Sequence, residues 1–454
     1  MAHHHRRCIA LLVLAGALAA CSGDDSQPSD DAATADKRET GSSDASTSTN
    51  PVTPRPETDP QTETPTPQEE DGAALDEADL ERLEVTVTAP REIVTLEDGT
   101  LLIADQAGLV HVMEPDGDQR AEPMLDLSED INTPGRRALE AGLAGFALAP
   151  DFPESGHVYT TATHSVTTVD VELPTGTRQV NILSRWTADP QTLTVDPATE
   201  EQLLVLPSRD EDHVGGEIVF DDHGLLYTAL GAPSRDAAAQ DPQSYAGSVL
   251  RIDPTPEPGQ EHEDRAYGIP EDNPFADGQA GLPEVYSYGY RNPWRLTWDI
   301  DHGLLVGEAM SNDKHQQVGQ PAPGDDAGYP EVSGACWEDS SLSEGCQQTE
   351  AGIAIAPPVL EYGPEVGAIL SGVALGTGGD LQGRVIVTDW EGSVLAADPG
   401  QAPWTYELLT DGSDLADGQS YLWDVDAEPD GSLYLLTAGR RMGEGLGAVY
   451  RLEP

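Results

Sequence analysis

The stretch Gly216-Glu-Ile-Val-Phe-Asp-Asp-His-Gly-Leu-Leu-Tyr-Thr-Ala-Leu-Gly231 consists of two short apolar runs on either side of a polar break. The runs contain Ile, Val, Phe, Leu and Tyr, which fit a pleated and buried strand. The break contains Asp-His-Gly, and Asp and Gly are residues that tight turns favour. The stretch therefore predicts a β-hairpin.

Similar hairpin units recur along the chain. Clear copies begin at Arg91, Trp294 and Leu422, and looser copies begin at Gly142 and Leu370. Together with the first unit, these copies predict an all-β fold, a six-bladed β-propeller, because radial closure removes the sheet edges that would otherwise be exposed. A pair of β-sandwiches is the competing architecture, and the regular recurrence of one hairpin argues against it.

The N-terminal part of the chain has a different character. Residues 1–20 contain arginines followed by an apolar run, which is the form of a secretory signal peptide. The run ends in Leu18-Ala-Ala-Cys21, which is similar to a bacterial lipobox and implies lipidation of Cys21. An ordinary signal peptide with an incidental cysteine is the alternative. An exported lipoprotein, periplasmic or on the cell surface and bound to the membrane through its lipid anchor only, is therefore expected.

The tether and the propeller follow the signal. Residues 21–82 are rich in Ser, Thr, Pro and acidic residues and contain no aromatic residue, which predicts a disordered acidic tether. Residues 83–454 then hold the propeller, and the early apolar run at 83–89 is expected to complete its last blade. Cys336 and Cys346 remain as a pair within this domain, and in an oxidising compartment they predict a disulfide. Free or metal-binding thiols are the alternative.

The charge of the chain limits its partners. It carries 23 Lys and Arg against 82 Asp and Glu, a formal net charge of −59 at pH 7. Such a surface repels nucleic acids and anionic membrane surfaces, so neither is expected as a partner. The acidic residues are spread along the whole chain, which is typical of a strongly solvated surface.

Three motifs occur in a fixed order. They are Gly142-Leu-Ala-Gly-Phe-Ala-Leu-Ala-Pro-Asp-Phe152, Asp212-His-Val-Gly-Gly216 and Tyr288-Gly-Tyr-Arg-Asn-Pro-Trp294. As a set they resemble the soluble quinoprotein glucose/sorbosone dehydrogenases, which are PQQ-dependent aldose sugar dehydrogenases. The resemblance implies a propeller whose central cleft holds PQQ with Ca²⁺. It also implies a sugar substrate whose hydroxyl proton goes to a histidine as hydride passes to the quinone; the later electron acceptor is unknown.

The resemblance assigns roles to four residues. His213 is expected to be the catalytic base, since a base for a hydroxyl proton should titrate near the working pH. Arg291 and Asn292 are expected to bind the cofactor, with the planar guanidinium facing its anionic oxygens. Glu140 occupies a place where the family often has Gln or Glu and is expected to bind the cofactor too. Without the family, His213 would be read as a polar loop residue.

Two regions depart from the family pattern. The segment from Glu308 onward, where the family has a calcium loop, continues with Lys314 and His315 and then two glutamines. Backbone carbonyls can still bind a hard cation there, but the basic residues are poor neighbours for one, so the metal ligands stay unknown. The stretches 388–392 and 420–424 lack the lysine or arginine that the family places against the cofactor.

The nearest basic residues to these stretches are Arg384, Arg440 and Arg441, and their positions in the fold do not follow from the sequence. A catalytically degenerate propeller that binds a sugar or a protein at the cell surface is therefore the alternative to a sugar dehydrogenase. A metal-dependent lactonase on a similar propeller is a weaker third hypothesis.

Overall fold

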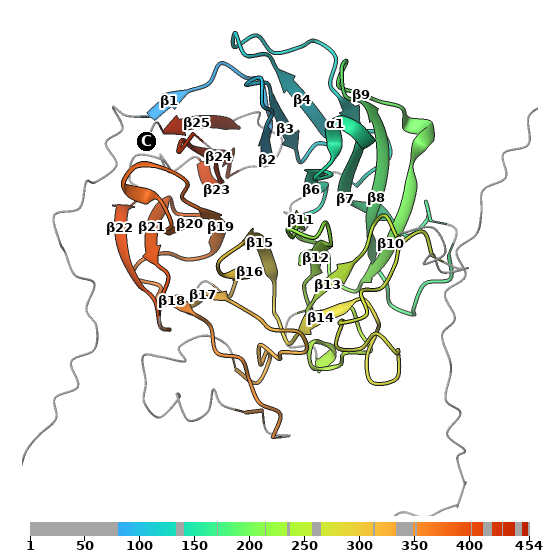
Figure 1. Ribbon diagram of the computed structural model, residues 1–454. Coiled ribbons are helices and arrows are strands. Elements are labelled where there is room, and N and C mark those ends of the chain that lie inside the picture. The colour runs from blue at the N-terminus through green and yellow to red at the C-terminus, as the bar shows by residue number, and fades with distance from the viewer. Residues whose placement is uncertain are drawn as a thin grey trace, which may run out of the picture. The chain divides into compact units, whose positions relative to one another are not determined.

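The computed structural model describes residues 80–132, 140–169, 171–213, 215–233, 237–256, 265–311, 314–332, 348–349, 352–400, 402–411, 420–428, 430–440 and 447–452. In this part of the chain the strands form six antiparallel sheets, arranged as blades around a common axis (Figure 1). The prediction of an all-β, six-bladed propeller is therefore confirmed.

Each blade runs from an inner strand near the axis to an outer strand at the rim. The first three blades are β2 (Pro90–Thr95), β3 (Leu101–Asp105), β4 (Leu109–Met113), β5 (Leu125–Asp126); β6 (Leu143–Leu148), β7 (His157–Ser165), β8 (Gln179–Asp189), β10 (Glu201–Ser208), with β9 (Thr194–Val195) beside β8; and β11 (Val219–Phe220), β12 (Leu226–Leu230), β13 (Ser248–Ile252), β14 (Val285–Tyr288). The last three are β15 (Pro293–Asp299), β16 (Gly303–Glu308), β17 (Gln316–Gly319), β18 (Leu360–Tyr362); β19 (Leu370–Leu375), β20 (Val385–Asp389), β21 (Ser393–Asp398), β22 (Thr405–Asp411); and β23 (Ser420–Ala427), β24 (Leu433–Gly439), β25 (Ala448–Leu452), β1 (Leu80–Arg82). Short helical turns lie between strands: α1 (Phe152–Ser155), η2 (Pro197–Thr199), η3 (Ala237–Gln240) and η5 (Gly379–Leu381).

The hairpin of the third blade shows how the turn residues act. Asp221 Oδ1 accepts hydrogen bonds from the backbone N–H groups of His223 (2.9 Å) and Leu225 (2.8 Å). Gly224 has φ +80°, a left-handed conformation that glycine adopts without steric cost. The side chain and the glycine together reverse the chain between β11 and β12, as the sequence predicts.

The core lies between neighbouring blades, because alternate side chains of a strand point to opposite faces of its sheet. In β3, Leu102 packs against the second blade, whereas Ile103 packs against the sixth. In β20, Val387 packs against the fourth blade and Ile386 against the sixth. Burying each such side chain contributes about 1.5–3 kcal/mol, so every interface between blades stabilises the ring.

The ring is closed by a strand from the start of the domain. β1 pairs with β25, and Leu80 lies opposite Leu452. The sequence places the closing strand at residues 83–89; the structure confirms the blade but has the strand at 80–82. Leu83 still donates its N–H to Val449 (2.9 Å), and Val85 packs between the sixth and first blades, so the apolar run anchors the segment without extending the ladder.

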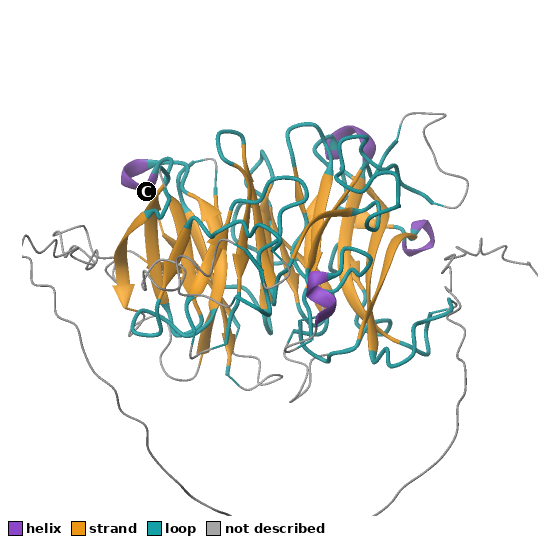
Figure 2. Cartoon of the chain, turned by 90° about the horizontal axis from the view of Figure 1, so that it is seen from below, coloured by secondary structure: helices purple, strands orange, loops and turns teal. Residues whose placement is uncertain are grey.

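Five of the six inner strands contain a register shift just after they begin. The first paired residue after each shift therefore occupies an equivalent place near the axis; these residues are Glu92, Gly145, Arg295, Gly372 and Asp424. Figure 2 shows the strands running between the two faces of the ring, with loops at both. Inner and second strands are antiparallel, so within a blade the inner strand begins beside the end of the second strand. Hydrogen bonds join these ends across neighbouring blades, for example from Gln106 to Ala141 and from Leu422 to Trp390, so they share one face of the ring.

Candidate active site

His213, Glu140 and the pair Arg291–Asn292 come from three blades and meet at this face. Glu140 precedes β6, His213 precedes β11, and Arg291 and Asn292 precede β15. Glu140 Oε2 accepts the backbone N–H of His213 (2.5 Å), and Glu140 Oε1 accepts the side-chain N–H of Asn292 (3.1 Å). The structure therefore brings the four residues predicted from the sequence into one cluster.

The His213 imidazole has a fixed orientation. Its Nδ1 lies 2.7 Å from the carbonyl oxygen of Ala232, which can only accept, so Nδ1 carries the proton and donates. The Nε2 atom is left with its lone pair. The backbone of His213 has φ 55°, a left-handed conformation that is uncommon for a residue with a side chain. The hydrogen bond from its N–H to buried Glu140 helps to hold this conformation.

Gly231 leaves the space in which this cluster forms. A Cβ atom at this position would lie 2.6 Å from the Cβ of His213 and 2.9 Å from Oδ1 of Asn292. Real Cβ atoms essentially never approach other atoms so closely, so an added methyl group would push the two side chains apart. The absence of a side chain at position 231 therefore allows the side chains of His213 and Asn292 to lie close together.

Electrostatics favour a neutral His213. Burial lowers its pKa from the ordinary value, and the nearby Arg291 guanidinium lowers it further. Burial raises the pKa of Glu140 to about 7, against the opposing effect of its hydrogen bond from His213 and of the Arg91 and Arg291 charges. A neutral imidazole with a free Nε2 is the form that accepts a proton.

Arg291 is held on the other side of the cluster. Its backbone N–H donates to Glu308 Oε1 (2.5 Å), and its Nη1 donates to the carbonyl oxygen of Ala309 (2.7 Å). Glu308 Oε2 accepts the Gln317 side chain (2.5 Å), and burial raises the pKa of Glu308 to about 7. Glu308 thus fixes the start of β15 from the end of β16.

An aromatic cluster adjoins these residues. Trp294, Trp423, Trp390 and Tyr421 pack with small residues at the same face. The rings of Trp390 and Trp423 are stacked with centroids 5.0 Å apart, and Tyr421 lies 4.9 Å from Trp390. The indole nitrogens of Trp294, Trp390 and Trp423 are buried, and none has a hydrogen-bond partner among the described residues. Trp294 and Trp423 are buried, so the flat apolar surface at this face is provided by the half-buried Trp390 and Tyr421.

Arg91 joins the aromatic cluster to the His213 cluster. Its guanidinium lies over the Trp423 ring at 4.1 Å and near the Trp294 ring at 5.1 Å. Its charge acts on Glu140 as well. Neither Arg91 nor the aromatic cluster was predicted from the sequence, in which the stretches around Trp390 and Trp423 stand out only because they lack basic residues.

Arg384 and Arg440 are the described arginines near the stretches 388–392 and 420–424, and they lie in different places. Arg384 precedes β20 and pairs with Asp398 and Glu407 (both 2.9 Å), on the outer strands of its blade. Arg440 follows β24 at the site face, where its guanidinium lies 4.5 Å above the Tyr421 ring and donates to Glu391 (2.6 Å). Arg441 lies outside the described residues, as do Cys21, Cys336 and Cys346.

Gln316 forms several hydrogen bonds with the segment that follows β16. Gln316 Oε1 accepts the N–H of Met310 (2.9 Å), and its Nε2 donates to the carbonyl oxygens of Ser311 (3.3 Å) and Lys314 (3.2 Å). The Ser311 carbonyl oxygen also accepts the N–H of Lys314 (2.8 Å), and a carbonyl oxygen with one donor keeps a second lone pair. Residues 312 and 313 lie outside the described residues, and no metal ligand is assigned in the described part of the segment.

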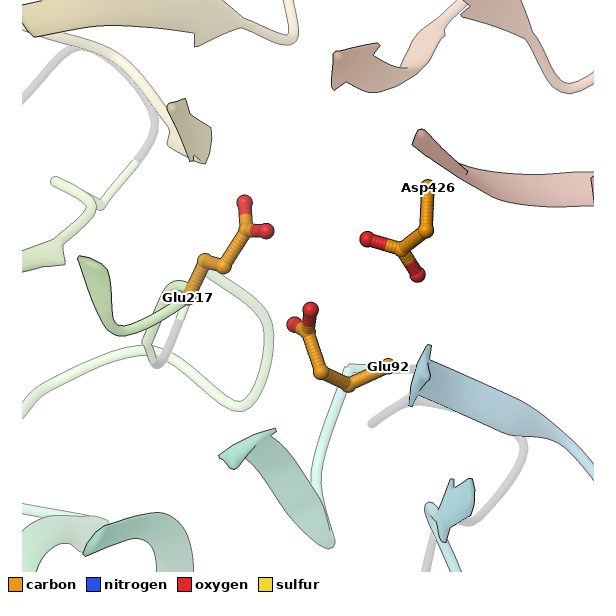
Figure 3. Close-up of side chains that lie close together, drawn as sticks. All are labelled: Glu92, Glu217 and Asp426. Carbon is orange, nitrogen blue, oxygen red and sulfur yellow. The ribbon is translucent and has the colours of Figure 1, made fainter. Parts of the chain in front are cut away.

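Among the described residues, one group of carboxylates could hold a metal ion: Glu92, Glu217 and Asp426 (Figure 3). This group was not predicted from the sequence. A signal for two of its members exists in the repeat, because Glu92 and Glu217 both precede Ile-Val in their hairpin units.

No helix of the described residues is long and apolar enough to cross a membrane.

The glucose/sorbosone dehydrogenase family model matches residues 87–445. The chain belongs to this family. The resemblance found in the sequence is therefore confirmed over most of the propeller. Aldose sugar dehydrogenase YliI of Escherichia coli strain K12 is 26% identical over 330 residues, which cover 69% of this chain and 78% of that protein.

The chain is also similar to a protein with a different name and to a solved structure. Hedgehog-interacting protein of Mus musculus is 27% identical over 240 residues, 50% of this chain, and the chain spans only 33% of that relative's length. A PQQ-bound aldose sugar dehydrogenase structure from Streptomyces coelicolor has a TM-score of 0.60 at 20% identity, covering 82% of this chain and 97% of that one. This structural likeness shows that the two chains share a fold.

Proposed function

We propose that this glucose/sorbosone dehydrogenase family member oxidises a hydroxyl group of an aldose sugar, with His213 as the base. The observation that carries the proposal is the His213 imidazole, whose Nδ1 is bound to Ala232 while Nε2 is free to accept a proton. The lowered pKa of His213 keeps this nitrogen unprotonated at neutral pH. Glu140 and Asn292 fix the loop that carries it.

The oxidation removes two hydrogen atoms from the substrate, one as a proton and the other as a hydride. Oxidation of a CH–OH group to C=O removes the hydroxyl proton and a hydride from carbon. His213 Nε2 receives the proton, and burial of the site strengthens this interaction by excluding water. PQQ, when bound, supplies the quinone that takes up the hydride.

The residues present fit PQQ, which is flat, rich in acceptors and anionic. The half-buried rings of Trp390 and Tyr421 provide a flat apolar surface, and the buried Trp423 ring stacks on Trp390 and holds it in place. Arg291 and Arg440 add positive charge at the same face, and Asn292 adds an amide. In this chain, aromatic stacking and these donors would replace the cations that the resemblance implies at 388–392 and 420–424.

Reconstitution tests the proposal. The full chain is loaded with PQQ, with and without Ca²⁺, and aldose-dependent reduction of a dye acceptor is followed. His213→Gln should abolish turnover without loss of folding, whereas His223→Gln should not, because His223 lies exposed on the hairpin turn of the same blade. Absence of turnover with bound PQQ would count against the proposal.

A binding function without catalysis is the second candidate. The observation that favours it is the aromatic surface of Trp390 and Tyr421, because sugar rings stack on aromatic side chains without any need for a cofactor. A PQQ titration separates the two functions. Saturable binding with one PQQ per chain favours the dehydrogenase, whereas sugar binding in the absence of any PQQ binding favours the second candidate.

We further propose that the protein is exported and acylated on Cys21. The support is the Leu18-Ala-Ala-Cys21 motif after an apolar run of signal-peptide length. Mass spectrometry of the mature N-terminus, with Cys21→Ser as the comparison, tests this. An unmodified terminus that still begins at Met1 would rule it out.

A further inference from the structure

Glu92 and Glu217 occupy equivalent positions in the first and third blades. Both precede Ile-Val at the start of an inner-strand segment, and both face the axis of the ring. Asp426 reaches the same space from β23 in the sixth blade. Figure 3 shows the three carboxylates pointing toward one another from these separate blades.

The spacing of the three carboxylates suits a shared ligand. One oxygen atom from each residue can be chosen so that all three lie within 4.8 Å of one another. Oxygen ligands on opposite sides of Ca²⁺ are about 4.6–5.2 Å apart, because each Ca²⁺–oxygen distance is about 2.3–2.6 Å. The corresponding separation across Mg²⁺ is only about 4.2 Å. Spacings up to this limit all suit oxygen ligands that share one Ca²⁺ ion, whereas only the shorter spacings in the same range suit Mg²⁺.

Two of the three carboxylates are each held by one backbone hydrogen bond. Glu217 Oε2 accepts the N–H of Leu296 (2.8 Å), and Asp426 Oδ2 accepts the N–H of Ile93 (3.1 Å). Glu92 is 8% exposed, and its Oε2 has no hydrogen-bond partner among the described residues. Glu92 and Glu217 lie within hydrogen-bond reach of each other, and burial raises the pKa of both, so the pair needs a proton or a cation between its oxygens. The Glu92 Oε2 atom without a donor favours a cation, because a buried carboxylate oxygen without a partner is costly.

Arg295 is a positively charged residue beside this group, and its guanidinium already has partners within the protein. Arg295 acts electrostatically on all three carboxyl groups. Its guanidinium forms an ion pair with Asp424 (2.8 Å) and donates to the carbonyl oxygens of Ser371 (2.7 Å) and Trp423 (3.0 Å). Arg91 acts on Asp424 as well, but not on the other three carboxyl groups. Burial raises the pKa of Glu92, Glu217 and Asp426, so protons or a bound cation must offset the charge that Arg295 leaves at the axis.

We propose that Glu92, Glu217 and Asp426 bind one Ca²⁺ ion on the axis of the propeller. Carboxylate oxygens are the ligands of hard cations, and a divalent ion offsets the excess charge that Arg295 leaves. The ion joins the first, third and sixth blades across the axis, so it stabilises the closed ring. The site is separate from the segment after β16, and the proposal goes beyond the proposed function.

Calcium binding is tested on the full chain without PQQ, so that the result does not depend on dehydrogenase activity. Metal is removed with a chelator, and Ca²⁺ is titrated in 0.2 M NaCl to screen the general acidity of the surface. Wild type should bind one ion that is lost in the variants below, and its unfolding midpoint should rise by about 5 °C at saturating Ca²⁺. An equal concentration of Mg²⁺ should have a smaller effect.

Variants assign the ion to the axis. Glu92→Gln and Glu217→Gln keep the shape of each side chain and remove its charge, so each should abolish most of the Ca²⁺-dependent rise. The double variant Asp116→Asn/Asp118→Asn removes two exposed acids of a surface turn and should keep it. Terbium luminescence, excited through neighbouring Trp423, reports the same site in the folded wild type. A wild type without a Ca²⁺-dependent rise, or a full rise in Glu92→Gln, overturns the proposal.

Discussion

The imidazole Nδ1 of His213 lies 2.7 Å from the carbonyl oxygen of Ala232, and this contact decides which nitrogen can act as a base. Ala232 follows β12, the second strand of the blade that His213 introduces. The hairpin that defines the fold therefore also orients the proposed base.

The pH dependence of kcat/KM should report His213. Its pKa is lowered by burial and by Arg291, so the imidazole should be neutral at pH 7 and become protonated only below its ordinary range. We expect kcat/KM to fall on acidification below about pH 6.5, measured with protein loaded with PQQ beforehand. A fall with its midpoint above pH 6.5 would show that another group takes the proton.

Glu140→Gln should impair catalysis more than folding. Both Glu140 oxygens accept protein N–H groups, and an amide can accept only one of them. We expect kcat to fall by about 10²-fold, with little change in KM, since the base loses its positioning. Glu154→Gln, on the exposed surface of α1, is the matched control. Activity within twofold of wild type would refute this role.

Gly231→Ala should disturb the same cluster sterically. The new methyl group would meet the Cβ of His213 at 2.6 Å, so we expect at least a tenfold loss of kcat/KM. Gly400→Ala should have no effect, because a Cβ at that position meets no atom within 4 Å. Equal activity in both variants would show that the site tolerates a shift of His213.

Trp390→Phe should weaken PQQ binding while keeping an aromatic ring. The substitution makes the half-buried ring smaller and weakens its stacking with Trp423 and Tyr421, and we expect about a tenfold loss of affinity. Trp298→Phe is the control, because Trp298 also stacks on an aromatic ring, that of Tyr227, but lies between the third and fourth blades. Titration by quenching of tryptophan fluorescence measures both. If both variants bind PQQ equally well, the Trp390 ring does not form part of the PQQ site.

Glu308 should make the fold less stable as pH rises. Burial raises its pKa from 4.5 to about 7, so the folded state binds the proton more tightly than the unfolded state. The resulting stability is complete below pH 4.5 and is lost as pH rises through about 7, by an amount on the order of 3 kcal/mol. Thermal unfolding of Glu308→Gln between pH 5 and 8 should therefore decline less than wild type or Glu154→Gln. Parallel declines in all three would contradict this.

The fold was predictable because its signal is local and repeated. Each hairpin carries its own turn residues, such as Asp221 and Gly224, and the count of hairpins gives the number of blades. The exact place of the closing strand was not predictable, because three paired residues at 80–82 carry little pattern and the more apolar run follows them.

The site was predictable only in part. His213, Arg291 and Asn292 stand in motifs, and Glu140 lies at a spacing that the family uses. Partners that depend on the closed ring gave no local signal: Arg91 reaches Trp423 from a distant part of the sequence. The axial carboxylates were hidden among 82 acidic residues, although the equivalence of Glu92 and Glu217 is visible once the repeats are aligned.

Aldose-dependent dye reduction by the PQQ-loaded chain, compared between wild type, His213→Gln and His223→Gln, decides whether His213 is the base of a sugar dehydrogenase. Wild type and His223→Gln should turn over at similar rates, and His213→Gln should bind PQQ but lose at least about 10²-fold in kcat. Turnover that survives in His213→Gln, or a wild type that binds PQQ and oxidises no aldose, would show that His213 does not have this role.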